Sequence, residues 1–413
     1  MGILCLLVAS SCQPASRTTL PIQTIDNPAA SGARLPRLSS LPNGGLLMSW
    51  VEDFQKEHAL KFAVRKNGRW VRQGEIALGE NWFINWADFP SVRAIDSSFW
   101  VAHWLVKYPG GQPFDYDIAI SLSTDAGVTW SQPIHPHRDG IAAEHGFATI
   151  FPVDDDAGII WLDGREYKKT TTHQKDQKLS GNFSLRFTRM DRQGNFGKEH
   201  IIDDNTCTCC GTTVANTTTG PVAAWRSRTD KEIRDNQIAH LQGDQWSAPQ
   251  SLGAEGWEIA GCPVNGPMLA AQGLHVVGAW FTEEGDRPRV RAALSTDGGQ
   301  TFSQPIDIDD TNPVGRLGVA WSNQNTAVVT WITAPDQATN TPSLALRSLS
   351  INGSIGPIQY LTGISGGRDS GFPQISAEPS GLFLAWTGAS PDYGIHTAWI
   401  PSEKLDHEQS VLK

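Results

Sequence analysis

The sequence predicts an all-β chain folded as a seven-bladed β-propeller, with four short strands in each blade. The 40 Gly and 25 Pro among 413 residues, in a chain almost without long amphipathic helical patterns, indicate many short strands joined by turns. An apolar run that ends in Trp recurs seven times, at intervals of roughly 50 to 65 residues. A segment near the N-terminus resembles the strand that the last repeat lacks. The alternative is a six-bladed propeller.

The N-terminus, "MGILCLLVASSC", predicts a bacterial lipoprotein signal in which Cys12 is lipidated and residues 1–17 form the signal and a short tether. An ordinary secretory signal is the alternative. Either one predicts export to the periplasm or the outer membrane, with membrane contact only through a lipid anchor. No other apolar run approaches the length that spans a bilayer. The net charge of −10 offers no basic face for nucleic acid.

A single propeller domain is predicted over residues 18–402. Its period is marked by runs such as "GLLMSW" and "GPVAAW", which end at Trp50, Trp104, Trp161, Trp225, Trp280, Trp331 and Trp386. Each repeat also holds a strand before this run, a strand and tight turn after it, and a fourth strand such as "SQPIDID". Four short strands in each repeat are typical of a propeller blade.

The seventh repeat indicates how the ring closes. After Trp386 it holds one clear strand, "GIHTAWI", and then a polar tail over residues 403–413. The segment "LPIQTID" at 20–26 resembles "QPIDIDD" at 304–310, so it is predicted to complete the last blade. Such pairing would remove the open edges of the ring.

Candidate binding residues recur in the lead-in segments, which we define as the loops that enter the first strand of each repeat. In a propeller these loops gather at one mouth of the central channel, and function concentrates in such loops. Together with the loops after the second strands, they contain the candidate side chains for binding a small-molecule or glycan ligand. These are Glu144, His145, Asp163, Arg165, Arg226, Arg228 and Asn265. Arg34, Arg316 and Arg368 would suit an anionic ligand such as a carboxylate. The alternative for each Arg is a structural ion pair.

Half of the 6 cysteines lie in "DDNTCTCCGTTVA". Cys207, Cys209 and Cys210 lead into one blade and Cys262 leads into the next, so the four are expected close together. In an exported protein, disulfides are the first interpretation. A soft-metal site for copper or zinc, which His145 could join, is the second. A redox-active Cys209–Cys210 pair is the third. The C-x-C-C run is not a familiar zinc pattern, and spacing alone leaves the three open.

Two turns, "STDAGVTW" and "STDGGQTF", share the pattern S-x-D-x-G-x-T-W/F. Asp125 and Asp297 are predicted to be structural, capping backbone N–H groups of a tight turn. The pattern resembles the Asp box of the sialidase-like propeller superfamily. The segments "NWADFPS", "EHGF", "CTCCGT" and "GCPVNGP" resemble a group of exported bacterial sialidase-like proteins.

The resemblance implies a site with three arginines for a sugar carboxylate, an aspartic acid as acid and base, and a Tyr nucleophile activated by Glu. Arg34, Arg316 and Arg368 would form the triad, and Asp88 would be the acid. None of the 5 Tyr lies in a lead-in segment, although Tyr167 or Tyr393 could reach in from a loop. Such enzymes also have six blades. We therefore predict a propeller that binds a ligand or soft metal, with an exo-sialidase or related glycosidase, and a non-catalytic scaffold, as alternatives.

Overall fold

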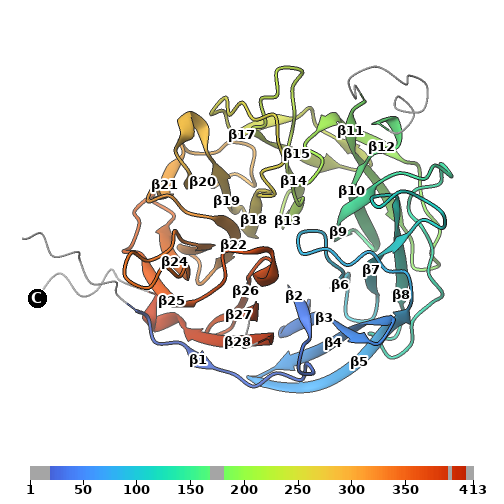
Figure 1. The fold of residues 1–413 in the computed structure, drawn as a ribbon, viewed down its shortest axis with the longest axis horizontal. Coiled ribbons are helices and arrows are strands. Elements are labelled where there is room, and N and C mark those ends of the chain that lie inside the picture. Colours follow the sequence, from blue (N-terminus) through green and yellow to red (C-terminus); the bar gives the residue numbers. More distant parts are fainter. Residues whose placement is uncertain (1–18, 168–180, 389–392, 406–413) are drawn as a thin grey trace, which may run out of the picture.

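The computed structural model describes residues 19–167, 181–388 and 393–405. Within them, seven antiparallel sheets are arranged around a central axis as the blades of a propeller (Figure 1). The predicted seven blades are confirmed, and the six-bladed alternative is wrong. Five sheets have four strands, one has three and one has five. The predicted signal, its Cys12 and most of the C-terminal tail lie outside the described residues. No helix among the described residues is long and apolar enough to cross a membrane.

The blades follow one another along the chain, and the first strand of each lies nearest the axis (Figure 1). The first three comprise β2 (Arg34–Ser40), β3 (Leu46–Phe54), β4 (Glu57–Lys66) and β5 (Arg69–Gly79); β6 (Ser91–Ala94), β7 (Trp100–Lys107) and β8 (Tyr116–Ser123); and β9 (His145–Val153), β10 (Asp156–Asp163), β11 (Phe183–Met190) and β12 (His200–Thr206). In the second blade an isolated bridge between Ile120 and Ile134 stands where a fourth strand would be.

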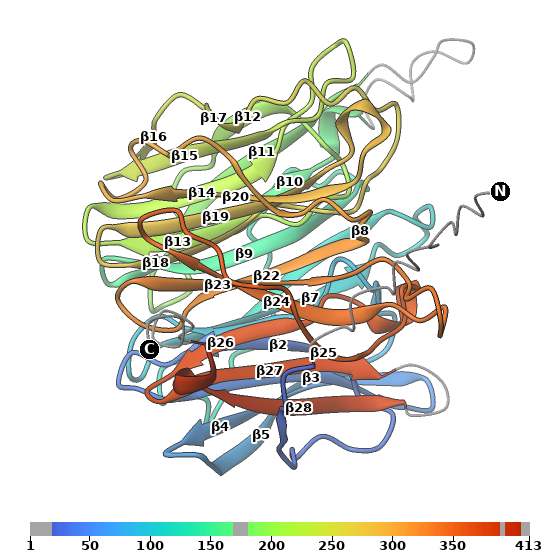
Figure 2. The same ribbon diagram turned by 90° about the vertical axis from the view of Figure 1, so that its left-hand side faces the viewer.

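The fourth to seventh blades complete the ring and are seen edge-on, one above another, in Figure 2. They comprise β13 (Thr213–Thr217), β14 (Gly220–Arg226), β15 (Asn236–Gln242), β16 (Gln245–Trp246) and β17 (Gln250–Gly253); β18 (Met268–Gln272), β19 (His275–Thr282), β20 (Arg289–Ser295) and β21 (Ile306–Asp309); β22 (Gly315–Trp321), β23 (Thr326–Ile332), β24 (Ser343–Ser350) and β25 (Gln359–Gly363); and β26 (Gln374–Glu378), β27 (Gly381–Gly388) and β28 (Gly394–Pro401).

The seven repeating tryptophans all lie in the second strand of a blade, and all are buried. Each indole fills the space between neighbouring sheets, which is why the period of the sequence matches the period of the fold. In five blades the buried indole N–H donates a hydrogen bond to a carboxylate: Trp50 to Glu52, Trp161 to Asp163, Trp225 to Asp203, Trp280 to Glu255 and Trp331 to Asp309. A buried indole N–H needs such a partner.

The ring closes as predicted from the N-terminal segment. Strand β1 (Gln23–Thr24) pairs antiparallel with β28, with Gln23 opposite Trp399 and Thr24 opposite Ala398. Leu20 is buried, and its backbone N–H donates to the Tyr360 carbonyl of the sixth blade. The N-terminal segment therefore joins two blades that are made from the far end of the chain.

Both Asp-box turns follow the third strand of a blade, β8 and β20. The Asp125 carboxylate accepts hydrogen bonds from the backbone N–H groups of Val128 and Thr129 and from the hydroxyls of Ser123 and Thr129. These bonds, led by the one from the Thr129 hydroxyl, lower the pKa of Asp125. Asp297 caps the equivalent turn through Thr301 and Ser295.

Candidate functional site at the channel mouth

Three of the inner strands begin with a β-bulge in which a residue other than glycine takes a left-handed conformation. These residues are Leu35 in β2, Phe147 in β9 and Arg316 in β22, with φ angles of 57°, 52° and 57°. The strand register shifts at the same places. Bulges of this kind bend a strand and redirect side chains near functional sites. In these three blades the bulge lies where the lead-in segment joins the inner strand.

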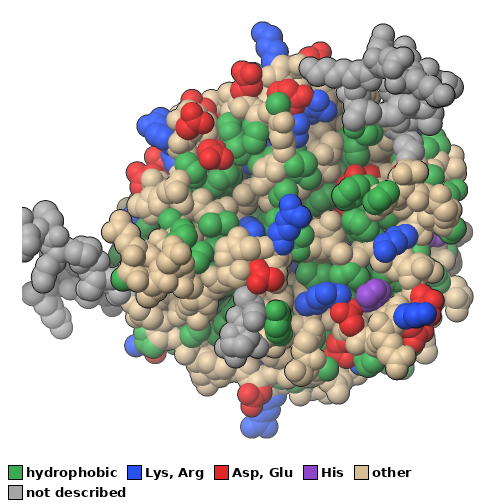
Figure 3. Space-filling model, in the orientation of Figure 1, with side chains coloured by type: hydrophobic (Ala, Val, Ile, Leu, Met, Phe, Trp, Pro, Cys, Tyr) green, Lys and Arg blue, Asp and Glu red, His purple; other side chains and the backbone are tan. Residues whose placement is uncertain are grey.

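The lead-in segments of six blades line one pocket of about 920 Å³, which we call the mouth pocket. Its wall includes Arg34, Trp86, Glu144, Cys209, Val264, Arg368 and Asp369. Two aromatic rings of the wall, Phe114 and Tyr393, are 60% and 63% exposed. On the face seen in Figure 3, basic and acidic side chains lie among hydrophobic ones around the centre of the ring. Glu144 also lines a neighbouring pocket of about 520 Å³, the side pocket, together with Arg228, Arg234 and Cys262.

Beside the mouth pocket, Asp88, Tyr116 and Glu144 form a carboxyl–tyrosine cluster. The Tyr116 hydroxyl lies 2.9 Å from Asp88 Oδ2 and 3.0 Å from Glu144 Oε1. A hydroxyl carries one proton, so it can donate to only one of the two acids. The other acid must then carry a proton of its own and donate to the tyrosine oxygen. At least one carboxyl in this cluster is therefore protonated when both hydrogen bonds are formed.

The pKa values agree with this count of protons. Burial raises the pKa of Glu144 to about 8 and that of Asp88 to about 7. Asp88 also accepts a hydrogen bond from the Phe147 backbone N–H, which favours its carboxylate form. The proton at neutral pH is thus held by Glu144, the member of the cluster that lines the mouth pocket. Burial also raises the pKa of Tyr116, whose ring is 1% exposed and stacks on Phe83.

Replacing Glu144 by Gln is expected to change how stability depends on pH. The folded chain keeps on Glu144 a proton that the unfolded chain releases near pH 4.5, so this group's contribution to the free energy of unfolding falls as pH rises from about 5 to 8. Glutamine mimics the protonated acid and removes that loss. Relative to the variant, the wild type should lose at least about 1.4 kcal/mol over this range, the equivalent of one pKa unit. Urea unfolding followed by Trp fluorescence at pH 5 and pH 8 measures this, and parallel pH profiles would contradict it.

The three arginines proposed for a carboxylate have different surroundings. Arg34 lines the mouth pocket and forms an ion pair with Asp53 at 2.6 Å. Arg316 is buried, and its guanidinium donates to carbonyls of residues 366, 367 and 371 and to the Ser370 hydroxyl. Arg368 is exposed on the wall of the pocket and, among the described residues, has no ion pair. The structure thus brings Arg34 and Arg368 into one pocket, whereas Arg316 holds the 366–371 loop through its backbone carbonyls.

His145, Asp163 and Arg165 lie together in a buried ion network rather than on the pocket wall. Arg165 pairs with Asp163 at 2.6 Å and with Asp139 at 2.8 Å. Burial lowers the pKa of His145, but hydrogen bonds with Asp117 and Asp139 outweigh it and raise that pKa to about 9. These side chains connect the third blade with the loops beside it.

Arg226 and Asn265 also lie beneath the mouth rather than on its wall. Arg226 is 2% exposed and donates to the carbonyls of Arg234, Asn265 and Phe281. The Asn265 side-chain oxygen accepts the Arg316 backbone N–H at 2.7 Å. Arg228, in contrast, lines the side pocket and pairs with Glu232.

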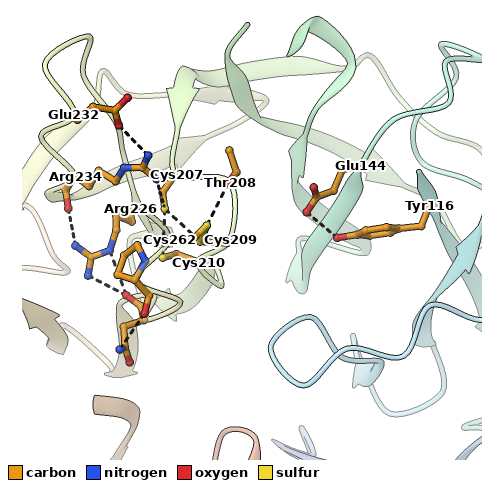
Figure 4. Close-up of a disulfide and its surroundings, with 12 residues drawn as sticks. Tyr116, Glu144, Cys207, Thr208, Cys209, Cys210, Arg226, Glu232, Arg234 and Cys262 are labelled. Carbon is orange, nitrogen blue, oxygen red and sulfur yellow. Dashed lines mark hydrogen bonds and ion pairs between the residues drawn. A yellow bond between two sulfur atoms is a disulfide. The ribbon is translucent and has the colours of Figure 1, made fainter. Parts of the chain in front are cut away.

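The four cysteines come together where two lead-in segments meet (Figure 4). Cys209 and Cys262 form a disulfide with a Cα–Cα distance of 6.0 Å. Cys207 and Cys210 are buried free thiols whose sulfurs lie 3.5 Å apart. The lead-in segments that hold Gly211 and Gly266 are in close backbone contact. A Cβ added to Gly266 would lie 2.1 Å from the Gly211 carbonyl oxygen, so only glycine fits there.

Among the described residues, three groups of side chains have atoms close enough for one metal ion. They are Cys207, Cys209 and Cys210; His137, Asp139 and His145; and Asp117, His135 and His137, which shares His137 with the second group. In the first group the Cys209 sulfur is already bonded to Cys262, which leaves two thiols for a soft metal. In the second, the two imidazole rings stack face to face at 3.8 Å, and His145 is paired with carboxylates. Copper or zinc at the cysteines stays a prediction.

Sequence reasoning missed two parts of this site. Tyr116 starts a third strand, outside the lead-in segments, and only its position just after the exposed Phe114 in "FDYDIAI" could have drawn attention to it. Cys207 and Cys210 have the C-x-x-C spacing of dithiol motifs, which the intervening Cys209 hides.

No protein-family model and no curated protein matches the chain. Solved structures similar to it include the intramolecular trans-sialidase from Ruminococcus gnavus, with 12% identity, 77% of this chain and 94% of that chain covered, and a TM-score of 0.47. The α-L-arabinofuranosidase of Fusarium graminearum has 12% identity, 94% and 98% coverage and a TM-score of 0.49. The α-L-arabinanase of Penicillium chrysogenum has 12% identity, 95% and 100% coverage and a TM-score of 0.48. At these identities the likeness concerns the fold alone.

Proposed function

We propose that the chain binds an anionic saccharide in the mouth pocket, with Arg368 as the cation that meets its carboxylate. One observation carries this proposal: the Arg368 guanidinium is exposed in a pocket of about 920 Å³ and has no carboxylate partner among the described residues. The neighbouring arginines are engaged, Arg34 with Asp53 and Arg316 with backbone carbonyls. A guanidinium in such a position is suited to a planar carboxylate.

Exposed aromatic rings on the wall of the mouth pocket give faces on which a sugar ring can lie, while the packed ring of Trp86 contacts Arg368. The Arg368 guanidinium carbon lies 5.9 Å from the centre of the Trp86 ring, which is itself fixed between Arg316 and Phe372. Phe114 and Tyr393 expose their rings on the same wall. Apolar faces combined with a few placed polar groups are typical of small-ligand sites.

The protonation state of Glu144 supports an anionic ligand. A charged glutamate on this wall would repel a carboxylate, and burial raises the pKa of Glu144 to about 8. At neutral pH the side chain is therefore mainly neutral, with its proton shared with Tyr116, and it does not repel a carboxylate. The charged groups of the wall are then Arg368, Arg34 with its partner Asp53, and Asp369, which accepts a hydrogen bond from Ser365.

Replacing Arg368 by Ala is expected to weaken binding of an acidic monosaccharide, such as N-acetylneuraminic or glucuronic acid, by at least about tenfold, as for a lost charge-assisted hydrogen bond. Titration calorimetry at low salt measures the affinity. Arg69→Ala removes the same charge from the exposed end of outer strand β5, and should leave the affinity unchanged. A wild type that binds neutral and acidic sugars alike, or equal losses in the two variants, would contradict the proposal.

Glycoside hydrolysis is the second candidate, favoured by Glu144 alone. A carboxyl that holds its proton at neutral pH beside a ligand pocket can act as a general acid. Tyr116 is not placed as a nucleophile, because its ring is buried and its pKa is raised. Release of the aglycone from an aryl glycoside of an acidic sugar tests this, with Glu144→Gln as the inactive variant.

Export to an oxidising compartment is part of the proposal. The Cys209–Cys262 disulfide supports it, because disulfides persist outside the reducing cytosol.

A further inference from the structure

We propose that the four cysteines form a thiol–disulfide relay, in which the buried Cys207/Cys210 dithiol and the Cys209–Cys262 disulfide at the mouth exchange their oxidation states. The relay would pass electrons between the buried pair and a thiol or disulfide of another molecule that docks at the mouth. It is independent of saccharide binding, because it uses neither Arg368 nor Glu144.

The positions of the sulfurs suggest the relay. Cys207 Sγ lies 3.8 Å from Cys209 Sγ, one end of the disulfide, and 3.5 Å from Cys210 Sγ, the other buried thiol. Cys207 is thus in contact with both the bond that it would attack and the thiol that would resolve the product. In thiol–disulfide exchange, a thiolate attacks one sulfur of a disulfide and forms a mixed disulfide, which a second thiol then resolves. Each attacking sulfur must therefore lie in contact with the sulfur that it attacks.

The charges around Cys207 favour the thiolate that such an attack needs. Arg234 Nη1 donates to Cys207 Sγ at 3.3 Å, and Arg234 is held by Glu232 at 2.8 Å. The hydrogen bond with Cys210, the backbone N–H of Cys209 and the charges of Arg226 and Arg234 lower the pKa of Cys207. Burial and the same sulfur contact raise the pKa of Cys210. These opposite directions favour the thiolate on Cys207 and the proton on Cys210.

The disulfide, in contrast, is open to the mouth. Cys209 lines the mouth pocket and Cys262 lines the side pocket, so the bond lies on the boundary between the two. Cys262 is exposed, whereas Cys207 and Cys210 are 0% and 2% exposed. The Thr208 hydroxyl lies 3.6 Å from Cys262 Sγ and can donate to the thiolate that leaves (Figure 4).

The exchange is balanced without an external oxidant. The Cys207 thiolate attacks Cys209 Sγ, the Cys209–Cys262 bond breaks, and Cys262 leaves as a thiolate that takes a proton from water. Cys210 then attacks Cys207 Sγ, its proton passes to Cys209, and the Cys207–Cys209 bond breaks. The products are a buried Cys207–Cys210 disulfide and two thiols at the mouth. Two electrons have moved from the buried pair to the mouth, where a docked disulfide can accept them.

Native-state alkylation tests the relay. The folded full chain is incubated with N-ethylmaleimide, acid-quenched, unfolded and mapped by mass spectrometry without reduction. In the wild type we expect the maleimide on Cys209 and Cys262, together with a Cys207–Cys210 disulfide. In Cys210→Ser the second step is blocked, so we expect the maleimide on Cys262 and a Cys207–Cys209 disulfide.

Cys207→Ser is the matched control because it removes only the attacking sulfur. Its Cys209–Cys262 bond should persist, and labelling of Cys262 should be at least about tenfold slower than in the wild type, since the thiolate is the nucleophile. Two results would overturn the relay: a wild type that keeps Cys209–Cys262 throughout, or equal labelling of Cys262 in the wild type and in Cys207→Ser. One equivalent of copper or zinc bound to Cys207 and Cys210 in the purified protein would also overturn it.

Discussion

Replacing Arg226 by Ala is expected to lower the free energy of unfolding by about 3 kcal/mol or more, because three buried carbonyls lose a charged donor. The Arg226 guanidinium is 2% exposed and donates to the carbonyls of Arg234, Asn265 and Phe281, and it lies 5.0 Å from the centre of the Trp257 ring. Alanine would leave these carbonyls unsatisfied and a cavity beside them. The loss should be visible in urea unfolding followed by Trp fluorescence.

Two variants separate this effect from a loss of charge. Arg226→Lys keeps the charge but not the planar fork, and should recover only part of the stability. Arg69→Ala, on an exposed residue of the outer strand β5, should stay within about 0.5 kcal/mol of the wild type. If Arg226→Ala also stayed within 1 kcal/mol, the guanidinium would not be the link between the fourth and fifth blades that the hydrogen bonds indicate.

Replacing Gly146 by Ala is expected to disrupt the carboxyl–tyrosine cluster. A Cβ at this position would lie 2.1 Å from Asp88 Oδ2 and 2.7 Å from the Tyr116 hydroxyl, closer than any real contact. One or both side chains must move, at a cost of about 1–3 kcal/mol typical of overpacking. Since the cluster sets the proton on Glu144, saccharide affinity should fall together with stability, and calorimetry and urea unfolding measure the two.

Gly197→Ala is the control for this substitution. A Cβ there would meet only the Arg189 carbonyl, at 3.8 Å, and the residue does not have a left-handed backbone. Its stability and affinity should match those of the wild type. A Gly146→Ala protein that keeps full affinity would show that binding does not depend on the hydrogen bonds of Tyr116.

The fold could be predicted because its signals are local and repeated. Each second strand ends near a Trp that must be buried between sheets, so the spacing of these residues reports the spacing of the blades. The closing strand can be recognised because the segment "LPIQTID", which contains β1, resembles "QPIDIDD", which contains β21. The Trp spacing and the strand likeness both depend on the pattern of apolar residues along the chain. Neither depends on the direction in which a side chain points at the end of a strand.

The site could be predicted only as a region. The repeat places a residue such as Arg316 near the mouth, but the left-handed bulge at this residue decides that its side chain goes beneath the 366–371 loop. Arg368, from the next lead-in segment, stays in the pocket. Likewise, the sequence does not show that Tyr116 reaches two acids from different segments. Those contacts, and the burial that shifts the pKa values, exist only after the ring is closed.

The pairing of β1 with β28 has a consequence for how the molecule assembles. Gln23 is synthesised long before Trp399, yet they are partners. Bringing such distant segments together costs on the order of 5 kcal/mol in chain entropy, and contacts of this range form late and slowly. Until then the nascent chain is an arc with two open sheet edges, which are prone to join other chains. A chaperone that shields those edges would matter most until β28 has been made and has paired with β1.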